Sequence, residues 1–236
     1  MNTTATTHVD YESKAASYFA EQRLEMLPFI PPSCGRLLEV GCGAGTFGER
    51  LKRTRKIEVW GVEPVSSAAE KAKAKLDHVV NGLFDPQSGL PEGAFDSIVF
   101  NDVLEHMIAP EQALRYAKVL LSPGGVVIAS IPNVRHLMLF WELMVRGRWE
   151  YRDCGLWDRT HLRFFTRSSI IKMFQDEGYA IDRITGINPY VGAPNPSRSL
   201  CMAYAIVNVL FIGKLADMKF QQFAVIARPS LERSSL

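Results

Sequence analysis

Three glycines at alternate positions are the sharpest chemical signal in the sequence. They stand in the run LLEVGCGAG at residues 37–45, where an apolar stretch passes directly into helix-forming residues. Glycine adopts backbone conformations that other residues avoid, and it lets a ligand approach the main chain closely. Gly41, Gly43 and Gly45 therefore predict a ligand-binding turn between a strand and a helix.

The residues around this turn indicate which ligand it binds. In the dinucleotide fingerprint GxGxxG, which places a pyrophosphate at a helix N-terminus, the third glycine comes one position later than Gly45 does. Glu39 precedes the turn, where its carboxylate would repel a pyrophosphate and would suit a ligand that carries an ammonium group. Glu63 closes the next expected strand, 22 residues after Gly41, and could accept both hydroxyls of a ribose. A dinucleotide stays open as the alternative ligand.

The histidines are the candidate proton acceptors, because imidazole titrates near neutral pH. His161 lies in the run DRTHLRFFT at residues 158–166, and His136 follows an expected strand. His161 is the first candidate for a general base, and His136 is a weaker one. The alternative for His161 is a structural role, with the ring packed between aromatic side chains and hydrogen-bonded to the backbone.

His106 is the third candidate and belongs to a cluster of side chains. Asp102, Glu105 and His106 have i, i+3, i+4 spacing, which on a helical turn would gather them on one face. Such a group could assist proton transfer or bind a divalent metal. A helix cap or an internal hydrogen-bond cluster is the simpler interpretation, and we predict no metal site.

Short apolar segments alternate with charged, helix-forming segments through most of the chain. Strands are expected at Arg36–Val40, Glu58–Val62, His78–Asn81, Phe95–Asn101, Gly125–Ile131, Tyr179–Thr185 and Gln222–Ala227. Helices are expected at Asp10–Leu27, Thr46–Arg53, Ser66–Leu76, Pro110–Leu121, Ser168–Glu177 and Leu200–Phe211. This alternation predicts βαβ units and a mostly parallel sheet with helices on both faces, in which ligands bind beyond the carboxyl ends of the strands.

Local signals mark the ends of two of these helices. The hydroxyls of Ser66 and Ser67 are placed to cap the helix that begins there. The run Pro123-Gly124-Gly125 is expected to end the helix that precedes it.

Four motifs in register make the chain resemble the class I S-adenosylmethionine-dependent methyltransferases. LLEVGCGAG is similar to their first motif, GVEP to the ribose-binding second, FDSIVFNDVLEHM to the fourth and LLSPGGVVIASIPN to the segment after it. The resemblance covers about residues 35–185 and implies an α/β fold with a Rossmann-like, doubly wound, seven-stranded mixed sheet. It also implies methyl transfer from S-adenosylmethionine to a small molecule, as in the ubiquinone-type and the glycan or secondary-metabolite O-methyltransferases.

The resemblance also implies cofactor-binding roles. The glycine turn would surround the methionine and ribose, Glu63 would hold the ribose hydroxyls, and Asn101 would lie beside the reactive methyl group. Leu83 stands where the family often has an acidic residue for the adenine amine, so Asp85 is the expected substitute. The cofactor-binding residues implied are Glu39, Gly41, Cys42, Gly43, Gly45, Glu63, Pro64, Asp85 and Asn101.

The residues that follow Asn101 bear on the methyl acceptor. Family members that methylate amines of nucleic-acid bases often read (Asn/Asp)-Pro-Pro-aromatic here, whereas residues 101–104 of this chain read NDVL. A hydroxyl oxygen of a small molecule is therefore the expected acceptor. N- or carboxyl-methylation of a metabolite, a nicotinamide-dependent oxidoreductase and a non-catalytic cofactor-binding or scaffold protein are the alternatives.

Residues 133–167 form an expected helical lid that is rich in arginine and aromatic residues. They hold seven arginines, no lysine and seven aromatic residues, among them Trp141, Trp149 and Trp157. Arginine binds carboxylates and phosphates, and tryptophan faces stack on rings, so an anionic or sugar-containing acceptor would fit. Alternatively, the segment binds single-stranded RNA, or its arginines pair with Glu142, Glu150, Asp153 and Asp158.

Length and composition limit the number of domains and the kinds of partner that the chain could have. The chain has 236 residues, a net charge of +2 and four cysteines without a CxxC pair. These values argue against nucleic acid as a partner and favour a reducing, cytoplasmic compartment. We expect one domain in five parts: an N-terminal helical segment (1–32), a Rossmann-like cofactor-binding core (33–132), the lid (133–167), the C-terminal part of the domain (168–228) and a tail (229–236).

One late segment is apolar on every side. Leu200–Ile212 has 13 residues, fewer than the about 20 that span a membrane, and neither a transmembrane helix nor a signal peptide is expected. Such a helix is usually buried in its own domain or against a second subunit. A dimer contact or an interfacial contact with a lipid-like substrate is the weaker option, and the chain is expected to be a monomer or a homodimer.

Overall fold

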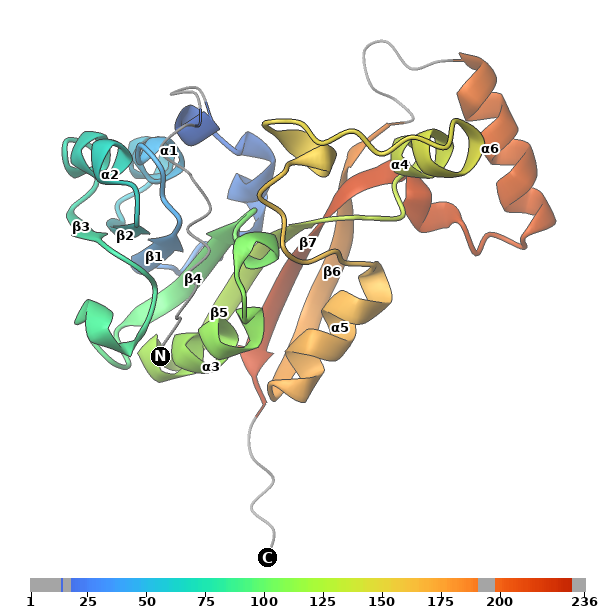
Figure 1. Cartoon of the computed structure of the whole chain (residues 1–236). Coiled ribbons are helices and arrows are strands. Elements are labelled where there is room, and N and C mark those ends of the chain that lie inside the picture. Colours follow the sequence, from blue (N-terminus) through green and yellow to red (C-terminus); the bar gives the residue numbers. More distant parts are fainter. Residues whose placement is uncertain (1–13, 15–17, 191–197, 231–236) are drawn as a thin grey trace, which may run out of the picture.

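Seven strands form one mixed sheet in the computed structural model, which describes Lys14, residues 18–190 and residues 198–230 (Figure 1). The strands are β1 (Arg36–Val40), β2 (Glu58–Glu63), β3 (His78–Asn81), β4 (Phe95–Asn101), β5 (Leu121–Pro132), β6 (Tyr179–Pro189) and β7 (Phe220–Pro229). Their order is β3-β2-β1-β4-β5-β7-β6. β1 to β5 pair in parallel, and β7 runs antiparallel to both β5 and β6. The expected seven-stranded mixed sheet is confirmed.

The direction of the strands places four segments at one edge of the sheet. β5 and β6 are both antiparallel to β7, so β6 runs in the same direction as β1 to β5. The segments that follow β1, β4, β5 and β6 therefore all lie at the carboxyl edge. They are the glycine turn, residues 102–109, residues 133–166 and, of the described residues, Tyr190 and residues 198–219.

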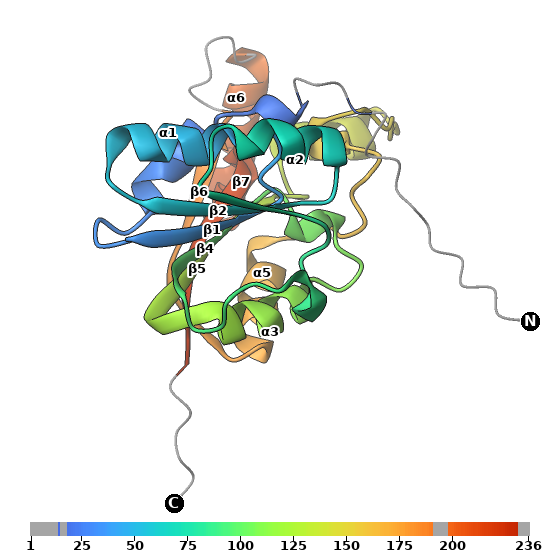
Figure 2. The same cartoon turned by 90° about the vertical axis from the view of Figure 1, so that its left-hand side faces the viewer.

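Helices cover both faces of the sheet (Figure 2). The helices are α1 (Thr46–Thr54), α2 (Ser66–Lys73), α3 (Pro110–Leu120), α4 (Leu137–Phe140), α5 (Arg167–Asp176) and α6 (Arg198–Leu210), and a π-helical turn at Trp141–Val145 continues α4. α1 and α2 lie on one face, and α3 and α5 lie on the other. The two faces bury separate clusters, one with Phe47 of α1 and one with Leu114 of α3 and Phe174 of α5.

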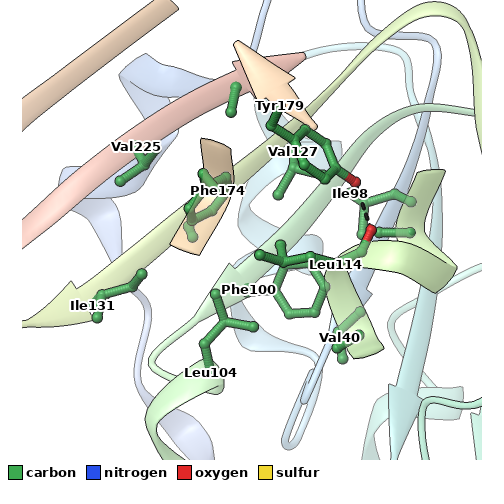
Figure 3. Packing of buried hydrophobic residues seen from close by; sticks show 14 of the residues in the cluster. Val40, Ile98, Phe100, Leu104, Leu114, Val127, Ile131, Phe174, Tyr179 and Val225 are labelled. Atoms are coloured by element: carbon green, nitrogen blue, oxygen red, sulfur yellow. Dashed lines mark hydrogen bonds between the residues drawn. The ribbon is translucent and has the colours of Figure 1, made fainter. Parts of the chain in front are cut away.

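The core beneath α3 and α5 fixes the position of β4, the strand that ends at the expected site. Phe100 of β4 packs there with Leu114, Phe174 and Tyr179, all of which are almost fully buried (Figure 3). The Tyr179 hydroxyl donates a hydrogen bond of 2.7 Å to the backbone carbonyl of Leu114. This bond ties the start of β6 to α3 inside an otherwise apolar cluster.

Replacing Tyr179 by phenylalanine should test this bond. Tyr179→Phe removes the donor and leaves the Leu114 carbonyl without it in a buried position, so we expect the free energy of unfolding to fall by about 1–2 kcal/mol. Urea denaturation followed by circular dichroism measures the change. Tyr116→Phe, at a half-buried hydroxyl that lies 3.1 Å from Ser88, is the control and should cost less.

The expected helix Asp10–Leu27 is wrong where the structure describes it. Residues 18–30 form two short 3-10 helices, Tyr18–Ala20 and Leu24–Phe29. Arg23 lies between them in a left-handed conformation with φ of +46°, which interrupts any continuous α-helix. Residues 10–13 and 15–17 lie outside the described residues.

Two expected helix ends also differ. α2 is preceded by Val65 without a side-chain cap, because the Ser66 hydroxyl donates instead to the Asn81 side chain at 2.9 Å. α3 ends at Leu120, and the Pro-Gly-Gly run at 123–125 lies inside β5, beside an irregularity in its pairing with β4.

The expectation that the Leu200–Ile212 segment is buried within its own domain is wrong for its described side chains, whereas burial against a second subunit stays a prediction. Met202, Ile206 and Val209 of α6 are exposed by 58–75%, and Ile212 is exposed by 88%. Among the described helices, none is both long and apolar enough to cross a membrane.

Candidate functional site

The glycine turn has the strained backbone that its sequence predicts. Gly41, Gly43 and Gly45 have φ angles of +67°, +52° and +71°, in the left-handed region that favours glycine. A Cβ atom on Gly43 would lie 2.7 Å from the carbonyl oxygen of Phe19, which accepts a hydrogen bond of 2.8 Å from the Ala44 N–H. The N-terminal segment therefore lies against this turn, and side chains are excluded from it.

Glu63 links the end of β2 to the turn. One of its carboxylate oxygens accepts from the Gly43 N–H and the other from the Val65 N–H, both at 2.9 Å. Each oxygen has a further lone pair, so the same carboxylate could also accept from two ribose hydroxyls. Burial raises the pKa of Glu63 from its ordinary value. Cys42 lies beside it, and burial raises the pKa of its thiol, which leaves it an unreactive neutral group.

Glu39 and Asn101 present polar atoms that the described residues leave without partners. Asn101 donates weakly to Glu39 at 3.4 Å, and both Glu39 Oε2 and Asn101 Oδ1 are buried without a hydrogen-bond partner. Burial raises the pKa of Glu39 to about 8. Two unpartnered oxygens beside a turn that excludes side chains fit a ligand with an ammonium group, as S-adenosylmethionine has, because the nearby positive charge would lower the pKa of Glu39 and favour its carboxylate form.

The residues expected near the adenine are either exposed or already hydrogen-bonded within the chain. Pro64 is exposed after β2, and Leu83 is exposed by 68%. Asp85 caps its own short helix, because its carboxylate accepts from the Gln87 N–H at 2.8 Å. Asp85 is thus already engaged locally, and a contact from it to an adenine amine would compete with this cap.

Asp102 does not join Glu105 and His106 on one face, so that expectation is wrong. Asp102 has a φ of +54°, which turns its side chain toward β5 and β7 instead. Its carboxylate accepts from Arg23, from Ser130 at 2.9 Å and from Gln222 at 2.9 Å. Sequence reasoning missed Arg23, which joins the N-terminal segment to the carboxyl ends of β4 and β5.

His161 takes the place that Asp102 was expected to occupy. Its Nε2 lies 4.0 Å from Glu105 Oε1, and its ring packs edge-on against His106 with centroids 4.8 Å apart. Glu105 is 1% exposed, and neither of its carboxyl oxygens has a hydrogen-bond partner among the described residues. Burial raises the pKa of Glu105 to about 8 and lowers that of His161 to about 4. At neutral pH the pair is therefore an uncharged carboxylic acid beside a neutral imidazole.

This cluster also has the donor atoms of a metal site. One donor atom from each of Glu105, His106 and His161 lies within 4.8 Å of the others. His106, however, has its Nδ1 3.1 Å from Thr160 and its Nε2 3.4 Å from the Tyr18 hydroxyl. Because both ring nitrogens of His106 are already engaged, a cation bound here would have to displace one of these contacts.

His136 lies in a different part of the carboxyl edge. It caps α4, because its Nδ1 accepts from the Met138 N–H at 3.3 Å, and its ring packs edge-on against Tyr190. Burial lowers the pKa of His136 to about 4. No hydrogen bond, ion pair or ring contact joins it to Glu105 or His161 in the described residues, and a role for it as a base stays a prediction.

The buried carboxyl of Glu105 should give the fold a measurable pH dependence. Its pKa is raised from 4.5 to about 8 on folding, so its favourable contribution is complete below pH 4.5 and is lost as the pH rises toward 8. By linkage the loss is on the order of 5 kcal/mol. We therefore expect the melting temperature of Glu105→Gln relative to wild type to rise between pH 6 and 8.5, measured by differential scanning fluorimetry. A constant difference over that range would contradict the buried, protonated state.

The arginines of residues 133–167 are partly neutralised within the chain. Arg146 pairs with Glu142 and Arg159 with Asp153, both at 3.0 Å, as the alternative interpretation expected. Asp158, however, pairs with Lys14 at 2.6 Å. Arg148 is exposed, and none of the ion pairs found among the described residues includes it.

The sheet order, the glycine turn and the acidic end of β2 define a Rossmann-like fold with a ligand-binding turn at the carboxyl edge of its sheet. Residues 11–184 match the family described as "Methyltransferase domain", and the chain belongs to this family. The protein is an S-adenosylmethionine-dependent methyltransferase, as the motifs implied.

Individual relatives agree with this family. The chain is 28% identical over 205 residues to the ubiquinone biosynthesis O-methyltransferase of Paramagnetospirillum magneticum, covering 82% of this chain and 78% of that one. It is 32% identical over 113 residues to the trans-aconitate 2-methyltransferase of Methylobacterium radiotolerans, covering 46% and 43%. A methyltransferase structure from Archaeoglobus fulgidus shares the fold, with a TM-score of 0.64 at 20% identity over 90% of this chain and 94% of that one.

Proposed function

We propose that this methyltransferase transfers the methyl group of S-adenosylmethionine to a hydroxyl oxygen of a small molecule. The observation that carries the proposal is the buried neutral imidazole of His161, backed by the carboxyl of Glu105 at 4.0 Å. A hydroxyl must lose its proton as it is methylated, whereas a carboxylate acceptor has none to lose. Relatives named for ubiquinone biosynthesis and for trans-aconitate support a small-molecule acceptor.

The glycine turn and the ends of β2 and β4 would hold the cofactor. In this proposal Gly41, Gly43 and Gly45 admit the methionine and ribose portions, and Glu63 accepts from the ribose hydroxyls in addition to its two backbone bonds. Glu39 and Asn101 supply their unpartnered oxygens to the ammonium group. When bound, S-adenosylmethionine supplies an electrophilic methyl group whose transfer leaves the neutral thioether S-adenosylhomocysteine.

Proton removal falls to His161. Its pKa of about 4 keeps the imidazole neutral at physiological pH, so a ring nitrogen can accept the hydroxyl proton as the oxygen–methyl bond forms and the methyl–sulfur bond breaks. The resulting imidazolium, 4.0 Å from Glu105, would hold this proton until it passes to solvent after methyl transfer, and its positive charge would lower the pKa of Glu105. His106 packs against the ring of His161 and would hold its orientation.

The acceptor is proposed to bind beneath residues 133–167, which act as a lid. His161, Arg163 and Phe164 line a small pocket together with residues at the end of β5. Arg163 is held over this pocket by a hydrogen bond to the carbonyl of Ile108. The free space of this pocket is about 10 Å³, room for about one water molecule. An acceptor with a ring and an anionic group, which Phe164, Arg163 and His161 would suit, would therefore enter only when the lid moves aside.

An acceptor screen tests the proposed chemistry. The protein is incubated with S-adenosylmethionine carrying a ¹³C-methyl group and with matched phenols, sugars, amines and carboxylic acids, and products are identified by NMR. Methyl ethers are the expected products. N-methyl amines or methyl esters as the main products would refute the oxygen assignment while leaving the methyltransferase class intact.

A further inference from the structure

The carboxyl edge carries an apolar surface that nothing in the described part of the chain covers. We call it the apolar edge, and it has two parts. The first is the end of α4 with its π-helical turn, and the second is α6 with the turn that follows it. Its members are Phe140, Trp141, Leu143, Met144, Val145, Met202, Ile206, Val209, Leu210, Phe211 and Ile212, and each is exposed by 38–88%.

The two parts lie on one side of the molecule. The segment before α4 and the segment after α6 are joined, because Arg135 bonds to Asp217 at 2.8 Å and to the Lys214 carbonyl at 3.3 Å. Both helices lie on the upper side in both views (Figures 1 and 2). Exposed apolar residues gathered in this way mark an interaction surface rather than chance exposure.

The charges beside these apolar residues identify the partner. From Arg198 to Ala216 the sequence has two basic residues and no acidic one. At the other part, Arg146 is paired with Glu142, and the exposed Arg148 is followed by the exposed Glu150, so the positive excess of the surface comes from the α6 part. Lys214 is exposed next to Phe211 and Ile212. The surface thus joins large apolar side chains to an excess of positive charge.

We propose that the apolar edge docks this protein on an anionic lipid bilayer. The side chains of Val209, Phe211 and Ile212 would enter the boundary between headgroups and acyl chains, and Arg148 and Lys214 would contact the anionic headgroups. A second copy of the chain fits less well, because two such surfaces packed face to face would bring their basic residues together, and these would repel each other. The docking would bring the methyl-transfer edge of the sheet to the lipid surface, since both lie at the carboxyl ends of the strands.

Vesicle co-sedimentation tests the docking without any methyl acceptor. The full chain should bind vesicles of phosphatidylcholine with phosphatidylglycerol at least about tenfold more tightly than vesicles of phosphatidylcholine alone, and added salt should weaken the binding. Val209→Glu should lower binding to the anionic vesicles by about tenfold or more. Val209 is exposed by 75%, so the substitution leaves the core intact.

Val119→Glu is the matched control. Val119 is also an exposed helical valine, on α3 and outside the apolar edge, and its substitution should leave vesicle binding unchanged. Lys214→Glu should reduce binding to anionic vesicles while sparing the residual binding to neutral ones. The proposal does not depend on the acceptor, and Gly43→Val, which should lose cofactor binding, should bind vesicles as wild type does.

Three results would overturn the docking proposal. The first is absence of binding to anionic vesicles. The second is equal binding by Val209→Glu and Val119→Glu. The third is a dimer in analytical ultracentrifugation that Val209→Glu dissociates while vesicles bind no wild-type protein, which would assign the apolar edge to a second copy of the chain.

Discussion

Gly43→Val should abolish binding of S-adenosylmethionine and S-adenosylhomocysteine. The new Cβ would lie 2.7 Å from the Phe19 carbonyl oxygen, and valine disfavours the φ of +52° that Gly43 adopts. The turn can relieve the clash only by moving, which breaks the bond from Ala44 N–H to Phe19 and displaces the Gly43 N–H from Glu63. We expect the dissociation constant measured by calorimetry to rise by at least about 100-fold.

Gly93→Val is the control, because it distinguishes a specific loss of cofactor binding from the backbone strain that valine causes at any positive φ. Gly93 also has a positive φ, +61°, but a Cβ there meets no atom within 4 Å. It precedes β4, at the edge of the sheet opposite the glycine turn. Both variants should retain the circular dichroism spectrum of wild type, and only Gly43→Val should lose the ligand. Cofactor binding by Gly43→Val within a few-fold of wild type would remove the glycine turn from the site.

His161→Asn should lower kcat for the acceptor found by the screen by about 10²–10⁴-fold, the usual contribution of a general base. The dissociation constant of S-adenosylhomocysteine should stay within a few-fold of wild type, because His161 contacts Glu105 and His106 rather than the glycine turn. Rapid-quench kinetics of a single turnover would show whether the chemical step itself is slowed.

His78→Asn is the control for this substitution. His78 stacks on Trp60 at the start of β3, half exposed and away from the carboxyl edge. It should leave kcat unchanged. A kcat for His161→Asn equal to that of His78→Asn would refute the base assignment and support the structural role that its aromatic surroundings also allow.

The glycine turn could be predicted because its signal is local. The tight strand-to-helix turn requires positive φ angles at Gly41, Gly43 and Gly45. Glycine adopts such angles at a lower conformational energy than any other residue type. The strands were predictable for a related reason. β4 is covered on both faces, and the apolar run at residues 98–100 inside it indicates a buried strand without any alternation.

The partners of the catalytic candidates could not be predicted, because they depend on contacts between distant residues. Glu105 was grouped with Asp102 by spacing, yet the positive φ of Asp102 turns its side chain to Arg23, and His161 fills the position beside Glu105. Arg23 was placed inside a helix because its neighbours favour one. The ion pair to Asp102, 79 residues later in the chain, is made only in the folded structure.

The exposure of α6 could not be predicted either, because its apolar sequence alone predicts a buried helix. The sequence shows that Met202, Ile206 and Val209 are apolar, but it does not show which residues pack against them. In the structure α6 lies beyond the end of the sheet (Figure 1), and its described apolar side chains face outward.

The most direct test of the central claim is a calorimetric titration of the wild-type protein with S-adenosylhomocysteine, repeated with NAD and with the variant Glu63→Gln. The site predicts micromolar binding of S-adenosylhomocysteine, no binding of NAD, and weaker binding by Glu63→Gln, because the NH2 group of glutamine would face a backbone N–H donor and could not accept from a ribose hydroxyl. Binding of NAD without S-adenosylhomocysteine, or binding of S-adenosylhomocysteine that Glu63→Gln leaves unchanged, would contradict the account.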